Sequence, residues 1–123
     1  MLDQKVTVSE LKEKVDRFIS EREWNKYHKP KDLSISIVLE SSELLEHFQW
    51  LTDDEIETML KDSRKLQQIE SELADIVIYC LSLSNTLHAD LSNVVLRKLR
   101  EDEAKYPIEK SKGFYRKYTD LDE

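Results

Sequence analysis

The chain has very little glycine, proline or cysteine for its length. Its 123 residues include one Gly, two Pro and one Cys. Because hairpins and tight β-turns depend on glycine, this scarcity argues against β-barrels and favours long helices joined by few turns. A single glycine also excludes a glycine-rich phosphate loop, and a single cysteine excludes an internal disulfide bond. We therefore expect an all-α fold in one domain that spans residues 1–123.

The sequence also lacks an excess of basic residues and any long apolar run. Its formal net charge is −7, with 19 Lys and Arg against 26 Asp and Glu. Nucleic-acid-binding proteins normally present a basic face, so we expect no nucleic-acid polymer as a partner. No apolar stretch approaches the roughly 20 residues that span a bilayer, and no signal peptide is recognisable. Together with Cys80, which we expect to be a buried free thiol, these absences predict a cytoplasmic protein without membrane association.

Apolar residues recur at helical intervals, and these intervals are bounded by residues that begin helices. Two pairs have capping-box spacing, and two aspartates are candidate N-caps. They are Thr7 with Glu10, Thr52 with Glu55, Asp32 and Asp90. We predict four main helices and one short helix, packed as a four-helix bundle that completes its core by oligomerising. The predicted helices are 7–26, 32–50, 52–60, 63–88 and 91–106, and an irregular tail is expected over 108–123. On the helix over 63–88, the residues expected to face a core are Ile69, Leu73, Ile76, Val77, Cys80, Leu83 and Leu87.

Four carboxylates occupy predominantly apolar faces of two predicted helices. Glu40 and Glu43 are three residues apart on one helix, and Glu72 and Asp75 are three apart on another. Carboxylates facing a core cannot stay ionised without a partner, because burying each would cost several kcal/mol. No Lys or Arg shares these faces, so a cation is the simpler partner. All-oxygen ligands favour a hard metal, Mg²⁺ or alternatively Mn²⁺.

Several other residues are candidates for substrate binding, each with an ordinary structural alternative. Trp24 and Trp50 end helices, where aromatic rings usually pack at the rim of a core but could sandwich a planar base. Cations near the C-terminal end of the last helix complement its dipole or could contact phosphate. The three histidines show no zinc-ligand spacing, and we favour a structural or exposed role for His47 and His88.

Two carboxylate motifs and the residues around them occur in a distinctive order. Glu40-x-x-Glu43-Leu44 is followed by Glu72-Leu-Ala-Asp75-Ile76. Other pieces are Trp24, His28-x-Pro30, Phe48-Gln-Trp50, Asp90-Leu91, Lys98, Lys105-Tyr106-Pro107 and the stretch 117–121. This ordered set, over roughly residues 10–121, resembles the MazG-like all-α nucleotide pyrophosphohydrolases and is most similar to their dCTP-pyrophosphatase branch.

The resemblance implies Mg²⁺-dependent hydrolysis of a nucleoside triphosphate to the monophosphate and pyrophosphate. It implies a homodimer or homotetramer with active sites near subunit contacts. The implied metal ligands and catalytic residues are Glu40, Glu43, Glu72 and Asp75. The implied substrate contacts are Trp24, His28 and Trp50 around the base and sugar, and Lys98, Asp102, Lys105 and Tyr106 on the phosphate side.

Three positions depart from the branch, and two rival functions remain. Ser42 replaces a usual Gly, while Asp102 and Asp32 each replace a usual Asn. An acid at Asp102 would repel phosphate unless it bound metal or a base amine, which leaves substrate preference open. One rival function is a phosphoribosyl-ATP pyrophosphohydrolase, which the aromatic residues argue against. The other is a non-catalytic helical interaction module whose acidic faces form subunit contacts.

Overall fold

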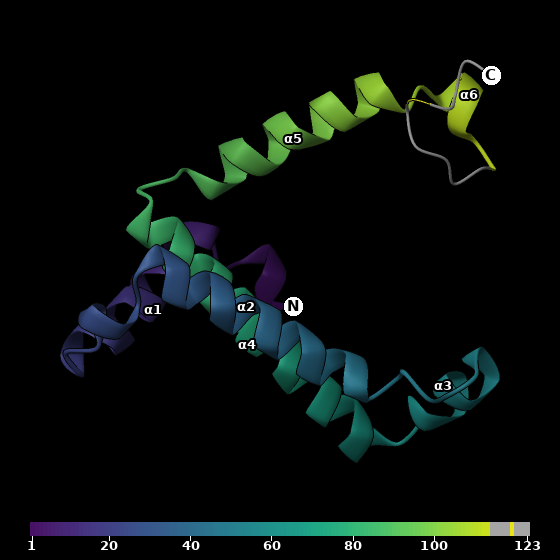
Figure 1. Ribbon diagram of the computed structural model, residues 1–123, viewed down its shortest axis with the longest axis horizontal. Helices are drawn as coiled ribbons and strands as arrows, with labels where there is room; N and C mark the ends of the chain where they lie inside the picture. The colour runs from purple at the N-terminus through teal and green to yellow at the C-terminus, as the bar shows by residue number, and fades with distance from the viewer. Residues whose placement is uncertain (114–118, 120–123) are drawn as a thin grey trace. The chain divides into compact units, whose positions relative to one another are not determined.

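The structure is a computed structural model that describes residues 1–113 and 119 (Figure 1). Within those residues every regular element is a helix and no strand occurs, so the predicted all-α fold class is confirmed. No helix in this described part is both long and apolar enough to cross a membrane. The chain divides into two compact units, Met1–Ala89 and Asp90–Glu123.

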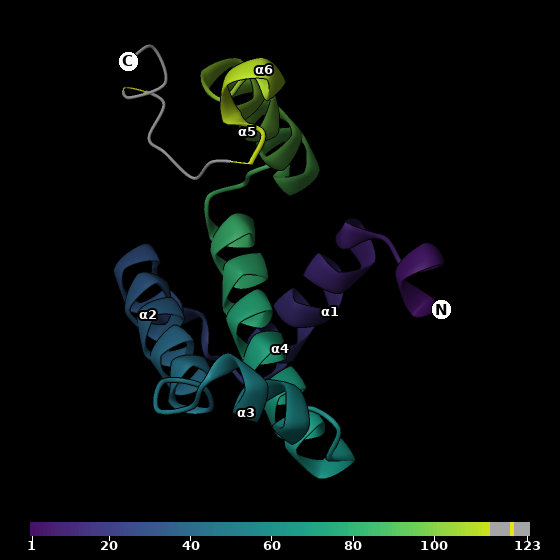
Figure 2. The same ribbon diagram turned by 90° about the vertical axis from the view of Figure 1, so that its right-hand side faces the viewer.

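The first unit is built around one long helix, α4. The helices α1 and α2 both pack against α4, and α2 lies alongside it in both views (Figure 1, Figure 2). A short helix, α3, connects α2 to α4. The elements are η1 (Leu2–Gln4), α1 (Val8–Glu21), η2 (Asn25–Tyr27), α2 (Pro30–Glu46), α3 (Asp53–Met59) and α4 (Ser63–Thr86).

Both predicted capping boxes are confirmed. Thr7 Oγ1 accepts a hydrogen bond from the Glu10 amide at 3.1 Å, and the Glu10 carboxylate accepts one from the Thr7 amide at 2.6 Å. Thr52 and Glu55 make the same reciprocal pair at 3.2 Å each. These bonds satisfy amide groups that the first turn of a helix would otherwise leave without acceptors.

Three predicted helix boundaries were wrong. The second helix ends at Glu46 rather than at residue 50, with His47 as its C-cap. The second helix begins at Pro30 with Lys29 as its N-cap, and Asp32 lies inside the first turn. The fixed φ of proline suits that first helical position. The first helix ends at Glu21 rather than near residue 26, because Glu23 adopts a positive φ of 55° and the Trp24 amide bonds back to the Ile19 carbonyl.

The buried apolar core of this chain is small. Its members are Ile19, Leu33, Ile69 and Leu81, and Leu33 on α2 is 1% exposed. Several residues predicted to face a core on α4 are exposed instead: Leu73, Val77 and Leu87. Cys80 is a free, half-buried thiol rather than a fully buried one. Only part of each apolar face is therefore covered within one chain.

The helix α2 carries serine hydroxyls that bond to its own backbone. Ser34, Ser41 and Ser42 donate to the carbonyls of Pro30, Ile37 and Val38 at 2.7, 2.7 and 3.0 Å. Each hydroxyl shares a carbonyl four residues earlier, a contact that slightly weakens and often bends a helix. Ser42, which stands where the related branch usually has Gly, is thus accommodated by a hydrogen bond within α2.

The second unit begins with the helix α5 (Leu91–Lys105). Asp90 caps it as predicted, accepting a hydrogen bond from the Asn93 amide at 3.1 Å. The helix ends before Pro107, and the predicted irregular tail opens with a one-turn helix, α6 (Ile108–Ser111). Apart from Thr119, the 117–121 stretch lies outside the described residues.

Candidate metal centre

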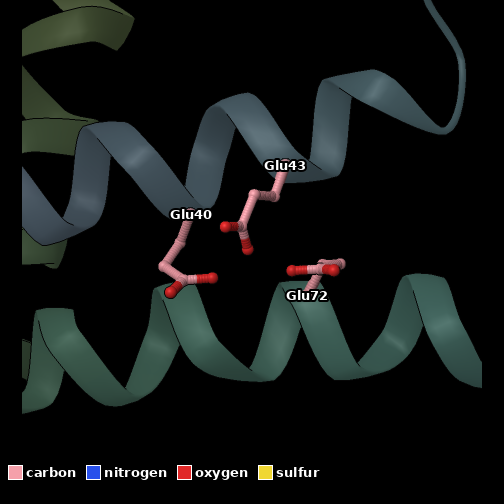
Figure 3. A group of neighbouring side chains, drawn as sticks. All are labelled: Glu40, Glu43 and Glu72. Atoms are coloured by element: carbon pink, nitrogen blue, oxygen red, sulfur yellow. The ribbon is translucent and has the colours of Figure 1, made fainter.

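Three of the four predicted ligands lie together between α2 and α4 (Figure 3). Glu40 and Glu43, one turn apart on α2, point toward Glu72 on α4. Each glutamate offers a carboxylate oxygen, and these oxygens lie within 4.8 Å of one another. Oxygens at this spacing can converge on one hard cation, whose bonds to oxygen are about 2.0–2.6 Å long.

The cluster is more open to solvent than the sequence led us to expect. Glu40 and Glu72 are half-buried, whereas Glu43 and Asp75 are exposed. The predicted cost of burial therefore applies chiefly to Glu40 and Glu72. Partial exposure also leaves the cluster accessible to a ligand from solvent.

Glu40 provides the test of whether these residues fit a cation. Its Oε2 atom is buried and has no hydrogen-bond partner. Burial, contact with Glu43, and the negative charges of Asp75 and Glu72 raise the pKa of Glu40 to about 7. A buried, unpartnered oxygen among like charges is costly, and a divalent cation would satisfy it. The donor set therefore fits Mg²⁺ or Mn²⁺.

Asp75 lies near the cluster but outside the group of three. It follows Glu72 by three residues on α4, and its charge contributes to raising the pKa of both Glu40 and Glu72. The structure does not bring its oxygen within the 4.8 Å group. Its role as a fourth ligand stays a prediction.

His47 joins the cluster, although sequence reasoning gave it no partner. Its Nε2 lies 3.8 Å from Oε1 of Glu72. Burial and the charge of Glu43 raise the pKa of Glu72, and His47 opposes that shift. The signal was present in the spacing, since His47 follows Glu43 by four residues and so shares its helix face.

Three aromatic side chains stack in a row between the connection before α2 and the C-terminal half of α4. The rings of Trp24 and His28 are nearly parallel, with centroids 6.5 Å apart. His28 in turn stacks on Tyr79 at 6.3 Å. Tyr79 is one turn beyond Asp75 on the same face of α4. The structure thus brings together Trp24 and His28, which were both predicted to bind substrate, and places Tyr79 beside them.

A pocket of about 310 Å³, lined mostly by residues of polar type, lies at the far end of this face. His28 lines it, and the His28 Nδ1 atom is buried without a hydrogen-bond partner. Ser82 is seven residues beyond Asp75, which corresponds to about 10 Å along the helix. No sequence motif marked this pocket. Its lining residues are Asp16, Ile19, Asn25, His28, Lys29, Ser82, Asn85, Thr86 and His88.

Trp50 does not join the row of rings. It lies between α2 and α3 and is 85% exposed. Its predicted contact with a base therefore stays a prediction.

The other predicted contacts belong to the second unit. Lys98, Asp102 and Lys105 are on α5, and Tyr106 is its C-cap. Lys98 Nζ lies 3.2 Å from Oδ1 of Asp102 and 3.8 Å from Oε2 of Glu101. Asp102 raises the pKa of Lys98. The unusual acid at Asp102 is therefore paired with a predicted phosphate contact.

Comparison with known proteins gives consistent results. The sequence profile of the MazG-like family matches residues 35–121. The chain is 35% identical over 115 residues to dCTP pyrophosphatase 1 of Bos taurus and 33% identical to that of Homo sapiens, covering 94% of this chain and 68% of each relative. A crystal structure of a pyrophosphatase from Archaeoglobus fulgidus matches with a TM-score of 0.75 and 40% identity, over 80% of this chain and 91% of that one.

Proposed function

The chain belongs to the MazG-like family, and we propose that it is a nucleoside triphosphate pyrophosphohydrolase that uses a divalent metal. The observation that carries the proposal is the convergence of Glu40, Glu43 and Glu72 around the unpartnered Oε2 of Glu40. Relatives that resemble this chain over 94% of its length are dCTP pyrophosphatases. They support a nucleoside triphosphate, of dCTP type, as the substrate.

The reaction adds water to the α-phosphorus and breaks its bond to the oxygen that bridges to the β-phosphorus, giving the monophosphate and pyrophosphate. In this chain Glu40, Glu43 and Glu72 would hold the metal, and Asp75 is proposed as a fourth ligand. A bound Mg²⁺ would neutralise phosphate charge and lower the pKa of a coordinated water. The protein's own role is to hold carboxylates, from two helices, at a fixed separation where the triphosphate docks.

The nucleoside is proposed to extend along α4 away from the carboxylates. Asp75, Tyr79 and Ser82 follow one another at three- and four-residue spacing, so one helix face joins the cluster to the pocket. The rings of Trp24 and His28 offer flat surfaces to a base, and the pocket offers polar groups to its edge. Trp50, Lys98, Asp102, Lys105 and Tyr106 are proposed to complete the substrate contacts.

We propose a homodimer or homotetramer as the working assembly. Within α2 the exposed apolar residues Val38 and Leu45 lie on the side of the helix away from Glu40 and Glu43. On α4 the exposed Val77 likewise lies on the side away from Glu72, and the exposed Leu73 lies to one side of it. A second copy would cover these faces and leave the carboxylates open. A cytoplasmic location stays a prediction from the sequence.

The proposal is tested by following monophosphate and pyrophosphate release with a panel of nucleoside triphosphates. The panel contains ribose and deoxyribose forms of the canonical bases, modified cytosine nucleotides and phosphoribosyl-ATP. We expect Mg²⁺-dependent turnover that Glu43→Gln and Asp75→Asn each abolish while helicity by circular dichroism stays unchanged. Glu46→Gln removes an exposed charge from the same helix and should retain activity.

Three outcomes would contradict this assignment. Full activity of Glu43→Gln with Mg²⁺ present would remove the carboxylate cluster from the chemistry. Turnover of phosphoribosyl-ATP alone would indicate the related histidine-biosynthesis activity. No turnover of any nucleotide, with no change in melting temperature on adding Mg²⁺, would support a helical interaction module.

A further inference from the structure

We propose that His47 is a positioning residue that holds the Glu72 carboxylate toward Glu40 and Glu43. This inference rests on the proposed function, since it concerns the same metal centre. It assigns a role to the one histidine that contacts the cluster in the described part of the chain.

His47 is placed for this role by the register of α2. Glu40, Glu43 and His47 are spaced by three and four residues, so they lie on one face of the helix. His47 is the C-cap residue of α2, where the chain turns away from the helix. Its Nε2 lies 3.8 Å from Oε1 of Glu72, so a small rotation of either side chain closes a hydrogen bond.

The pair of His47 and Glu72 is partly shielded from solvent. The side chains of His47 and Glu72 are 20% and 25% exposed, whereas those of Lys98 and Asp102 are 57% and 43% exposed. Water competes less with a partly buried pair than with a surface pair. The ring of Phe48 also packs edge-on against His47 with centroids 6.4 Å apart, which limits where the imidazole can turn.

The geometry indicates positioning rather than direct ligation. The group whose donor atoms lie within 4.8 Å of one another contains three glutamates and no histidine nitrogen. His47 therefore contacts one member of the group from its margin. Residues that contact a ligand in this way fix its orientation, and their loss commonly weakens metal binding by about 10- to 100-fold.

Without His47, Glu72 would face only like charges. Burial and the charge of Glu43 disfavour its ionised form, and Asp75 adds to this effect. An unrestrained Glu72 side chain would turn away from Glu43 toward solvent. Bringing it back to a cation would then cost rotamer entropy.

The test is calorimetric titration of the full-length protein with MgCl₂ at pH 8 without nucleotide, where histidine side chains are ordinarily neutral. We expect His47→Ala to bind Mg²⁺ about tenfold more weakly than wild type. His47→Gln, which retains a donor, should recover most of the affinity, and Gln49→Ala should match wild type. Melting temperatures in EDTA should be alike for all four proteins.

Other results would overturn the role of His47. Equal or tighter Mg²⁺ binding by His47→Ala would do so, as would equal losses in both His47 variants with an equal fall in EDTA melting temperature. Nitrogen coupling to Mn²⁺ bound in wild type would instead make His47 a ligand. An absence of saturable Mg²⁺ heat in wild type would overturn the metal centre itself, and this role with it.

Discussion

Glu40 combines two properties that seldom occur together in a glutamate. One of its oxygens is buried without a partner, and burial together with Glu43 raises its pKa to about 7. Below about pH 7 the metal-free protein holds the Glu40 carboxyl in its neutral form, and a cation is proposed to replace the proton. Metal and proton therefore compete for one side chain.

This competition gives the metal-free protein a defined pH dependence. The raised pKa means that folded Glu40 keeps a proton which unfolded Glu40 has lost above its ordinary pKa of 4.5. The free energy of unfolding should therefore fall as pH rises from about 4.5 to 7. In EDTA, Glu40→Gln should melt at a higher temperature than wild type at pH 7.5 and should lose that advantage at pH 4.5.

Saturating Mg²⁺ is the control for this measurement. It should stabilise wild type at pH 7.5 and have much less effect on Glu40→Gln. A constant difference in melting temperature between the two proteins at every pH would contradict a raised pKa at Glu40.

Asp102 allows a second prediction at the level of one residue. Lys98 is paired with Asp102 at 3.2 Å, so a phosphate must displace an existing partner to reach it. Asp102→Asn should lower the KM for the nucleoside triphosphate about two- to fivefold and leave kcat near wild type. Lys98→Ala should raise KM. An unchanged KM in both variants would show that this pair does not contact substrate.

At the scale of elements, the packing of α2 on α4 fixes the separation of the carboxylates. Leu33 is the most completely buried side chain of α2. Leu33→Ala should lower the free energy of unfolding by about 2–5 kcal/mol through cavity formation. Leu33→Met, which nearly conserves volume, should cost less than about 1.5 kcal/mol. Urea denaturation measures the free energy of unfolding of both variants. An equal loss in the two would show that Leu33 is not part of the core.

Local signals in the sequence predicted most of the helices and the carboxylates that share a helix face. The capping residues Thr7, Thr52 and Asp90 act within three residues of themselves, so their effects could be read from sequence. Helix periodicity likewise placed Glu40 and Glu43 on one face of α2. Their meeting with Glu72 depends on the packing of α2 against α4. The capping predictions succeeded because short-range geometry determines them.

The remaining features depend on tertiary contacts. The end of α1 is set by a positive φ at Glu23. A glutamate, unlike a glycine, gives no indication of that backbone conformation in the sequence. The pocket near Ser82 requires the fold to bring α1 and the connection before α2 against the end of α4. His47 has a partner only because α2 faces α4. Leu73 was predicted to face a core but is exposed. A helical pattern shows that one face is apolar, but it does not show whether the same chain or a second copy covers that face.

At the scale of the whole molecule, the exposed apolar faces predict self-association. Val38 and Leu45 on α2 are 64% and 55% exposed. Sedimentation analysis of wild type should give a dimer or tetramer at micromolar concentration. Combining Val38→Glu with Leu45→Glu should reduce the measured mass, because charges would then face an apolar surface. Gln49→Glu is the control, and a monomeric wild type would contradict the proposed assembly.

The serine hydroxyls of α2 have a consequence for how the site opens. Ser41 and Ser42 lie between Glu40 and Glu43 in the sequence, and their hydroxyls share carbonyls with the backbone amide bonds of α2. Such sharing slightly weakens a helix, so the amides of this turn should exchange hydrogen faster than those of helix turns without these contacts. A cation held by Glu40, Glu43 and Glu72 would link this turn to α4 and slow that exchange. Local opening of the turn would then admit and release nucleotide.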